Sequence, residues 1–242
     1  MKKAPKTILV TGCAGFIGSN FVKQFKKEFP KTKIIGIDNF STGRRDTLDT
    51  SIKFFEGSIL DTLLLNKIFS AHKPEFVFHF AAIPQVAHST DKPRHTSEIN
   101  IIGTVALLEA ARKYSVKRFI FSSSAAVYGN VKDPKKFPIK ESENPPDPES
   151  FMSAQKYAGE MLCTVSSRLF GLDTVSLRYF NVFGPRQYAG SAYAAVIPAW
   201  LESVDRSQKV FIEGDGNQTR DFCYVENVVS ANILAMKAER RL

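Results

Sequence analysis

The sequence has little cysteine and no long apolar run. Its three cysteines, Cys13, Cys163 and Cys223, are widely spaced and form no CxxC pair. Such an odd, scattered set excludes a disulfide framework and a cysteine-based zinc site, and it indicates reduced thiols. No stretch reaches the ~18 consecutive apolar residues that a membrane-spanning helix requires, and the first residues lack the features of a signal peptide. We therefore expect a cytoplasmic protein with no membrane partner.

Signals for a metal site and for nucleic-acid binding are also absent. His72, His88 and His95 are spaced wrongly for a metal site, so no metal is expected, and His79 at a strand end is expected to be a packed histidine rather than a base. The net charge of +9 would suit a nucleic acid, but the lysines are scattered and aromatic residues do not interleave them. They predict solvated helix faces and loops and no nucleic-acid partner, although a basic protein also suits an anionic small-molecule substrate.

Apolar strands and amphipathic helices alternate through the first two thirds of the chain. Continuous apolar runs predict strands at residues 7–11, 33–37, 52–55, 76–80, 117–121 and 173–178. Helical patterns lie near residues 16–28, 61–71, 96–114 and 151–169. This βαβα order predicts an α/β fold, a Rossmann-like doubly wound parallel sheet with strands buried on both faces.

The regular alternation ends at about residue 180, and short pieces follow. A last helix is predicted from residue 226 to about residue 239. We therefore expect residues 1–180 to hold the sheet, and residues 181–242 to form a small second lobe that partly returns to it. The proline- and charge-rich stretch at residues 133–148 is expected to be a long loop at the mouth of a site.

The run from Thr7 to Gly18 indicates a dinucleotide site. A strand enters a loop with glycines at positions 12, 15 and 18, and a helix follows. Gly12 permits a tight turn, Gly15 lets the backbone approach a phosphate, and Gly18 lets the helix pack close to the strand. Free N–H groups at the helix start would attract a pyrophosphate. The second strand ends at Asp38, twenty positions after Gly18, where a carboxylate would bind an adenosine ribose and repel a 2′-phosphate.

These and further motifs resemble the extended short-chain dehydrogenase/reductase family, in its branch of NAD-dependent nucleotide-sugar 4-epimerases. The resemblance covers nearly the whole chain. Its motifs are the glycine loop, Asp38-Asn39, His79-Phe80-Ala81-Ala82, Asn100, residues 122–129, Lys156, residues 178–185 and residues 216–225. It implies the cofactor NAD and a UDP-hexose or UDP-N-acetylhexosamine substrate. It also implies an NAD-binding domain at 1–180, a partial nucleotide-sugar lobe at 181–242, and a homodimer through the helices near 96–114 and 151–169.

The resemblance also assigns roles to individual positions. It implies that NAD contacts Gly12, Gly15, Phe16, Ile17, Gly18, Asp38, Asn39, Ser58, Ile59, Ala81, Ala82, Asn100, Ser122, Lys156 and Tyr179. It implies that the substrate contacts Ser89, Ser124, Asn181, Val196 and Arg220, with Arg220 as a diphosphate clamp. Ser58 stands where the family usually has an aspartate that faces the adenine amine. That contact is therefore expected to be weaker or mediated by water.

Family chemistry implies epimerisation at C4 through a transient 4-keto sugar. A tyrosine four residues before a lysine on one helix would move the O4 proton, and the lysine would hold the nicotinamide ribose and lower the tyrosine's pKa. Here the catalytic positions are Ser124, which would bind O4, Lys156, and Met152 in place of the tyrosine. A thioether has no proton to exchange. Tyr157 is no substitute, because five residues of helix turn it about 140° away.

The methionine leaves three interpretations open. Met152 would be an engineered change in an epimerase, or a natural change in a catalytically silent protein that binds NAD and a nucleotide sugar. In the third interpretation, a related reaction moves its proton through Ser124, Tyr128, His88 or a water. A standard 4,6-dehydratase is disfavoured because Ala125-Ala126 stand where such relatives carry an Asp-Glu pair. The family generally continues beyond the last residue here, so we expect a truncated sugar-binding lobe.

Overall fold

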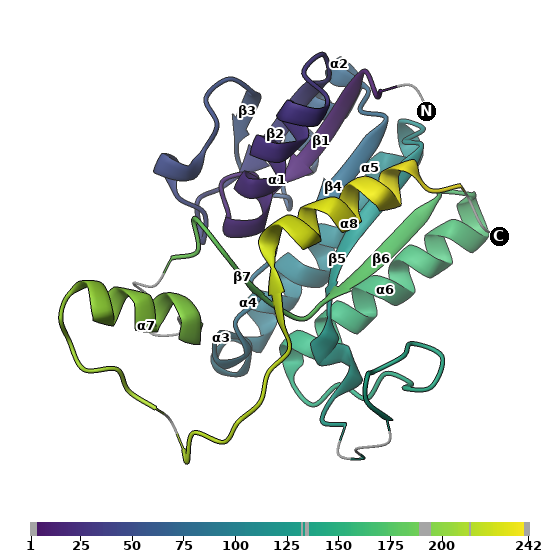
Figure 1. Cartoon of the computed structure of the whole chain (residues 1–242). Helices are drawn as coiled ribbons and strands as arrows, with labels where there is room; N and C mark the ends of the chain where they lie inside the picture. The colour runs from purple at the N-terminus through teal and green to yellow at the C-terminus, as the bar shows by residue number, and fades with distance from the viewer. Residues whose placement is uncertain (1–3, 132, 134–135, 189–194, 213, 240–242) are drawn as a thin grey trace.

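The chain is built around a parallel sheet of six strands with helices on both faces (Figure 1). The computed structural model describes residues 4–131, 133, 136–188, 195–212 and 214–239. The strands are β1 (Thr7–Thr11), β2 (Lys33–Asp38), β3 (Lys53–Glu56), β4 (Phe76–His79), β5 (Arg118–Ser124) and β6 (Thr174–Tyr179). Their order across the sheet is β3-β2-β1-β4-β5-β6. The winding therefore reverses between β1 and β4, and this leaves a crevice at their carboxyl ends. The predicted Rossmann-like, doubly wound fold is confirmed.

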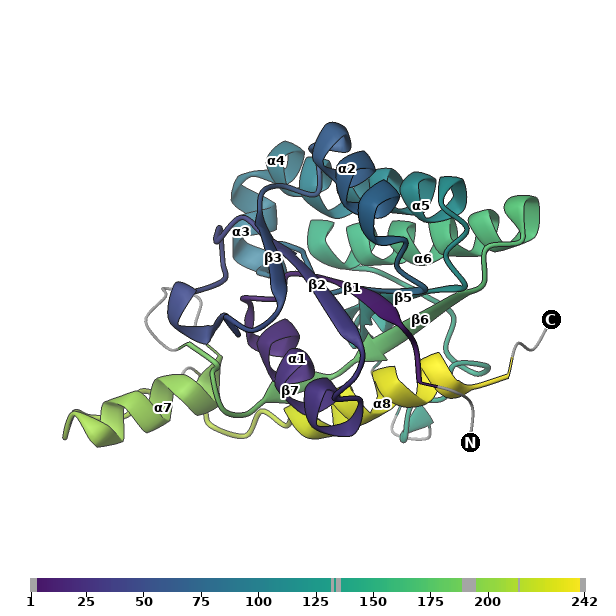
Figure 2. The same ribbon diagram turned by 90° about the horizontal axis from the view of Figure 1, so that it is seen from above.

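Each face of the sheet has its own helical layer and its own core (Figure 2). One face carries α2 (Thr62–His72), α5 (Gly103–Lys113) and α6 (Phe151–Phe170), and the other carries α1 (Phe16–Glu28) and α8 (Val225–Lys237). Within β1, Leu9 belongs to the first core, whereas Ile8 and Val10 belong to the second. Successive side chains of a strand point to opposite faces, so a strand covered on both faces is apolar throughout.

Most predicted elements lie within a few residues of their expected bounds, but the helix expected near residues 96–114 is not continuous. It is divided into α4 (Pro93–Ser97), a π-helical turn at Glu98–Ile102, and α5. The predicted strand at residues 117–121 is longer than expected, because β5 continues to Ser124. Among the residues that the structure describes, no helix is both long and apolar enough to cross a membrane.

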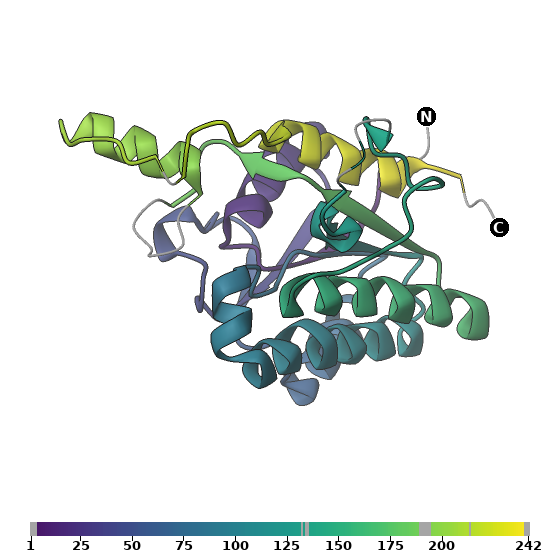
Figure 3. The ribbon, with the colours of Figure 1, turned by 90° about the horizontal axis from the view of Figure 1, so that it is seen from below.

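The segments after β6 form an outer lobe that the sequence analysis resolved only in part. Strands β7 (Asn181–Phe183) and β8 (Phe222–Tyr224) pair in parallel, and α7 (Val196–Asp205) stands away from the sheet (Figure 3). Neither the strand pair nor α7 was predicted. Three-residue strands give no periodic signal, and α7 leaves large apolar side chains exposed rather than in a core. Helix α8 returns to the sheet and packs beside α1.

The stretch at residues 133–148 lies beside β6 and α8. Its residues Ile139, Glu141 and Pro146 line a cavity together with Arg178 and Val228. Pro134 and Lys135 of this stretch lie outside the described residues. The loop therefore borders a cavity at the β6 edge of the sheet. Its described residues are not among those that line the crevice between β1 and β4.

Arg118 ties three elements together at the amino end of β5. It is buried, and its Nε and Nη2 atoms donate to Asp173 Oδ2 at 2.8 and 2.6 Å. Its Nη1 atom donates to the carbonyl oxygens of Ala235 and Ala238 at the end of α8, the latter at 2.9 Å. The last carbonyls of a helix have no partner within the helix, so this guanidinium caps α8 and holds it against the sheet.

We expect the substitution Arg118→Met to destabilise the protein by about 3–5 kcal/mol, because it leaves the Asp173 carboxylate and the α8 carbonyls without their partner. Lys117→Met is the matched control. Lys117 pairs with Glu75 at an exposed position, where an ion pair contributes about 0–1 kcal/mol. Unfolding in denaturant measures both values. Equal losses for the two variants would contradict the capping role.

Candidate functional site

Gly12 brings the loop after β1 against the end of β4. Its φ is +69°, and a Cβ atom added there would lie 2.7 Å from the Ala81 nitrogen. Its N–H donates to the Ile37 carbonyl oxygen at 2.9 Å. The loop therefore passes between the ends of β2 and β4 in a conformation that favours glycine.

The N-terminus of α1 opens toward the crevice. Gly15 precedes the helix and provides no capping side chain, so the first amides, of Phe16, Ile17 and Gly18, lack partners within the helix. A Cβ atom on Gly18 would overlap the Gly12 carbonyl group, which explains why the helix can begin so close to the loop. Free amides and the positive helix end make this turn suitable for a phosphate group.

Asp38 lies at the end of β2 beside this loop. Its Oδ2 atom accepts a hydrogen bond from the Ala14 N–H at 2.9 Å, and its Oδ1 atom accepts one from the Phe40 N–H at 2.8 Å. Burial raises the pKa of Asp38, and these backbone donors oppose the rise. The carboxylate therefore orders the glycine loop and remains at the wall of the cavity.

Two adjoining cavities form one continuous cleft, because they share Gly12, Gly15, Ser41, Thr42, Phe80 and Ala82. The first cavity is also lined by predicted cofactor residues, namely Asp38, Asn39, Ser58, Ile59 and Ala81. The second cavity is lined by Phe16, Ile17 and Gly18 at the start of α1, and by Arg44, Arg186 and Tyr188. The structure thus brings together most of the predicted dinucleotide residues. The two arginines and the tyrosine were missed, because they lie in loops without a periodic pattern.

His79 is held in a single neutral tautomer by its neighbours. The Thr104 hydroxyl donates to the Asn100 carbonyl oxygen at 2.7 Å, so it accepts from His79 Nε2, 3.0 Å away. The other ring nitrogen, Nδ1, then accepts from the Thr11 hydroxyl at 2.8 Å. Burial, with a contribution from the charge of Lys156, lowers the pKa of His79 to about 3. His79 is therefore a structural residue and not a base at neutral pH.

Asn100 lies inside the π-helical turn, and its side chain faces protein. Its Oδ1 atom accepts from the Ile83 N–H at 2.9 Å, and its Nδ2 atom donates to the Ile83 carbonyl and to Gln155 Oε1 at 3.0 and 2.8 Å. Gln155 in turn donates to Thr96 and Ser97. Gln155 is a positioning residue that the sequence analysis missed. Its only signal was a polar side chain on the inner face of α6.

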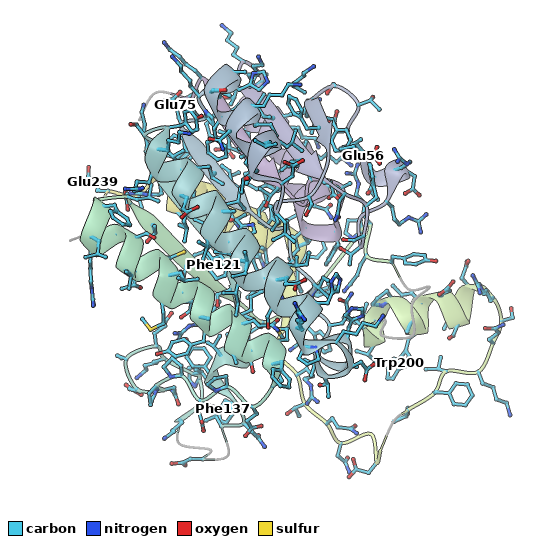
Figure 4. All side chains as sticks on the ribbon, turned by 180° about the vertical axis from the view of Figure 1, so that it is seen from behind. Glu56, Glu75, Phe121, Phe137, Trp200 and Glu239 are labelled. Atoms are coloured by element: carbon cyan, nitrogen blue, oxygen red, sulfur yellow. The ribbon has the colours of Figure 1, made fainter. Side chains whose placement is uncertain are left out.

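Lys156 extends from α6 to the carbonyl end of β5. Helix α6 begins with a capping box between Ser150 and Ser153. Lys156 Nζ donates to the Ser122 carbonyl oxygen at 2.7 Å and lies 5.2 Å from the ring centre of Phe121, which Figure 4 labels beside α6. Burial lowers the pKa of Lys156 to about 8. The ammonium group is thus held near the carboxyl end of β5.

Met152 lies one helical turn before Lys156 and is buried. Its backbone N–H donates to the Ser89 hydroxyl at 3.2 Å, and that hydroxyl donates to the Val86 carbonyl oxygen at 2.6 Å. Ser89 belongs to α3 (Val86–Asp91) and has no exposed surface. Its hydroxyl therefore joins α3 to α6, and the substrate contact expected of Ser89 remains a prediction.

The serines of β5 and Tyr179 have different environments. Ser124 Oγ accepts from the Ala126 N–H at 3.1 Å and so caps the 3₁₀ turn at Ala125–Tyr128. The Ser122 hydroxyl faces the Tyr179 hydroxyl at 3.4 Å. Asn232 of α8 also donates to that oxygen, at 2.7 Å. Burial raises the pKa of Tyr179 to about 12, so this phenol stays protonated.

The three predicted substrate residues of the outer lobe are not among the residues that line the cleft. Asn181 Nδ2 donates to the Asp221 carbonyl oxygen at 3.1 Å, and Arg220 donates to the adjacent Thr219 carbonyl oxygen. Val196 begins α7 and is 40% exposed. Their substrate roles remain predictions. Among the described residues, no three potential metal-ligating side chains form a cluster.

Comparison with known proteins gives consistent matches over the whole cleft. The model of the NAD dependent epimerase/dehydratase family matches residues 8–242. A putative UDP-glucose 4-epimerase of Methanocaldococcus jannaschii is 38% identical over 230 residues, which are 95% of this chain and 73% of the relative.

Two solved structures share the fold. The UDP-glucose 4-epimerase of Thermotoga maritima, solved with UDP-glucose, is 43% identical with a TM-score of 0.90, over 96% of this chain and 73% of that chain. The UDP-glucose 4-epimerase of Thermus thermophilus, in complex with NAD, is 34% identical with a TM-score of 0.88, over 97% of this chain and 75% of that chain.

We expect NAD to bind far more tightly than NADP. The 2′-phosphate of NADP would approach the Asp38 carboxylate, and close contacts between like charges cost several kcal/mol. Titration of the protein with both dinucleotides measures the ratio of their affinities. Asp38→Asn should narrow this ratio, because the amide carries no charge. Equal affinities of the unchanged protein for NAD and NADP would refute the role of Asp38.

Proposed function

The chain belongs to the NAD-dependent epimerase/dehydratase family, and we propose that it is a C4 epimerase of a UDP-hexose or UDP-N-acetylhexosamine. The observation that carries the proposal is the placement of Met152 one helical turn before Lys156 on α6, with Lys156 bonded to β5 two residues before Ser124. Lys156 reaches the Ser122 carbonyl. Because α6 connects two parallel strands, it is antiparallel to them. Four helical residues rise about 6 Å and two strand residues about 6.6 Å, so this direction would bring Met152 toward the end of β5 at Ser124.

The residues of the cleft fit NAD. Gly12 and Gly18 leave no space for a Cβ atom, and the first turn of α1 presents free amides to a diphosphate. Asp38 would accept the hydroxyl groups of the adenosine ribose, and Ser58 and Ile59 would border the adenine. Lys156 would donate to the nicotinamide ribose. When bound, NAD accepts a hydride from C4 of the hexose and returns it to the other face.

The chain's own residues must then hold the sugar and move one proton. The Ser124 hydroxyl would donate its hydrogen to O4, because the bond from the Ala126 N–H uses only its oxygen. The Lys156 charge would stabilise a nearby oxyanion. Met152 occupies the position of the proton carrier and has no exchangeable proton. Positioning and hydride transfer are therefore supported, while proton transfer is impaired.

A catalytically silent protein that binds NAD and a nucleotide sugar is the second candidate, and the buried Met152 is the observation that favours it. A dehydratase that uses another acid or base is a weaker alternative, because Ala125 and Ala126 carry no ionisable group. Adding UDP-glucose to the NAD-loaded protein separates the candidates. An epimerase would form detectable reduced nicotinamide and exchange UDP-glucose with UDP-galactose, whereas a silent binder would show neither.

The division into two domains is part of the same proposal. Residues 1–180 would form the NAD-binding domain, and residues 181–242 would contribute to a lobe for the nucleotide sugar, with α8 returned to the sheet. Within this lobe Asn181, Val196 and Arg220 would approach the diphosphate and uridine. Ala195, next to Val196, already lines the cleft, which supports this direction of approach.

We also propose a homodimer formed by α5 and α6. Met161, Val165 and Leu169 are spaced four residues apart, so they form one stripe along α6, and they are 41%, 46% and 69% exposed. Ile102, before α5, is exposed as well. A two-fold axis through this stripe would bury the stripe of one copy against the same stripe of the other copy.

Met152→Tyr should raise kcat for C4 epimerisation by about 10²–10⁴-fold, because general acid–base catalysis contributes about that much. KM should change little, since the hydroxyl acts in the transition state. The assay is interconversion of UDP-glucose with UDP-galactose, and of their N-acetyl forms. It is run with this chain and with a chimera that continues into the remaining part of the Thermotoga enzyme.

Met152→Phe is the matched control, because it supplies the aromatic ring without the hydroxyl. It should leave kcat at the level of the unchanged protein. If the methionine protein is already fast and tyrosine does not help, the proton moves through another group. Ser124, Tyr128 and His88 would then be the residues to substitute.

Val165→Glu should convert the dimer into a monomer, because it would place two carboxylates against each other across the two-fold axis. Light scattering after gel filtration measures the mass. Leu201→Glu is the control, since Leu201 is also an exposed apolar residue, on α7. The dimer assignment fails if the unchanged protein is a monomer, or if both variants dissociate it alike.

A further inference from the structure

Two segments that are far apart in the sequence meet outside the first turn of α1. One is the loop at residues 39–47, which follows β2 and ends in a 3₁₀ turn at Arg45–Thr47. The other is the segment at residues 184–188, which follows β7. Both belong to the wall of the dinucleotide cleft, and they lie on the same side of the molecule as the start of α7 (Figure 3).

The loop at residues 39–47 is attached to the glycine loop through Ala14. The Arg44 N–H and the Thr47 hydroxyl both donate to the Ala14 carbonyl oxygen, at 3.0 and 2.6 Å. A Cβ atom on Gly43 would lie 2.9 Å from Asp38 Oδ1. This loop is therefore packed tightly over the Asp38 end of the cleft and forms its outer wall.

The segment at residues 184–188 is attached to α1 from the other side. Asn20 Nδ2 donates to the Pro185 carbonyl oxygen at 2.8 Å, and Arg186 Nη1 donates to the Ser19 carbonyl oxygen at 3.0 Å. The same Arg186 atom is 3.4 Å from the Thr47 carbonyl oxygen. Hydrogen bonds thus anchor the two segments on either side of the start of α1.

Arg44 and Tyr188 form a contact between the two segments. The Arg44 guanidinium carbon lies 4.5 Å from the ring centre of Tyr188. Asp46 orients that guanidinium through two hydrogen bonds, from Nε at 2.9 Å and from Nη2 at 2.5 Å. Arg44 and Tyr188 line the same cavity as Phe16, Ile17 and Gly18. Their contact therefore forms part of the wall of the cavity that also contains the first turn of α1.

We propose that Arg44 and Tyr188 form a clasp over the dinucleotide cleft, which must open before the cofactor can enter or leave. This inference rests on the cofactor site and is independent of epimerase activity. It gives Arg44 and Tyr188 a role in retaining the cofactor, and it makes cofactor exchange depend on the outer lobe, to which Tyr188 is connected through β7.

The test is the dissociation rate of NAD from the full chain, followed by displacement of a fluorescent NAD analogue with excess NAD. Arg44→Met and Tyr188→Ala should each speed dissociation by about two- to fivefold, as expected for loss of one exposed cation–π contact. Tyr188→Phe keeps the aromatic ring and should leave the rate unchanged. The double variant Arg44→Met/Tyr188→Ala should dissociate no faster than either single variant, because the two residues act through one contact.

Arg45→Met is the control for loss of charge. Arg45 pairs with Glu56 at 2.7 Å and stacks on Phe40, at the edge of the sheet where Figure 4 labels Glu56, and it does not line the cleft. It should leave the rate unchanged. Unaltered rates in Arg44→Met and Tyr188→Ala, additive effects, or an equal effect of Arg45→Met would overturn the clasp alone. Absence of saturable NAD binding by the unchanged chain would overturn the cofactor site as well.

Discussion

The close passage of the backbone at Gly12 between β2 and β4 is the constraint on which the rest of the site depends. The Gly12 N–H is bonded to Ile37, and its α-carbon is packed against the Ala81 backbone. This passage places the start of α1 over the crevice where the winding of the sheet reverses. A side chain at Gly12 would move the loop away from β4, and the amides of α1 would then no longer face the cleft. The Asp38 carboxylate stabilises the same loop through Ala14.

A second set of polar contacts fixes α6 relative to that crevice. Ser89 binds the backbone of Met152, Gln155 binds Asn100 and Thr96, and Lys156 binds Ser122. These contacts are buried, so each polar group would be costly without its partner. These contacts restrict rotation and sliding of α6, so they fix position 152 relative to α3 and β5. At position 152 this fixed helix carries a methionine, whose thioether has no exchangeable proton.

Elements that depend on local sequence patterns were predicted, whereas features that depend on contacts between distant residues were missed. Strands β1 to β6 and helices α1, α6 and α8 were predicted because apolar periodicity and glycine spacing are local signals. The π-helical turn around Asn100 was missed, because it depends on bonds to Ile83 and Gln155, 17 and 55 residues away. The bond by which Ser89 joins α3 to α6 was missed as well, because it connects residues 63 positions apart. Helix α7 was also missed, and it leaves Leu201 and Val204 exposed.

The sequence by itself determined the fold class, the dinucleotide loop, the Asp38 carboxylate and the absence of a tyrosine at position 152. Each of these follows from residue type at a fixed spacing along one strand, loop or helix. Only the tertiary structure decided that His79 is a neutral, fully bonded residue, that Asn100 faces protein, and that Arg44 meets Tyr188. These are pairings between distant segments. Their geometry comes from how the sheet and helices pack, which local residue patterns do not encode.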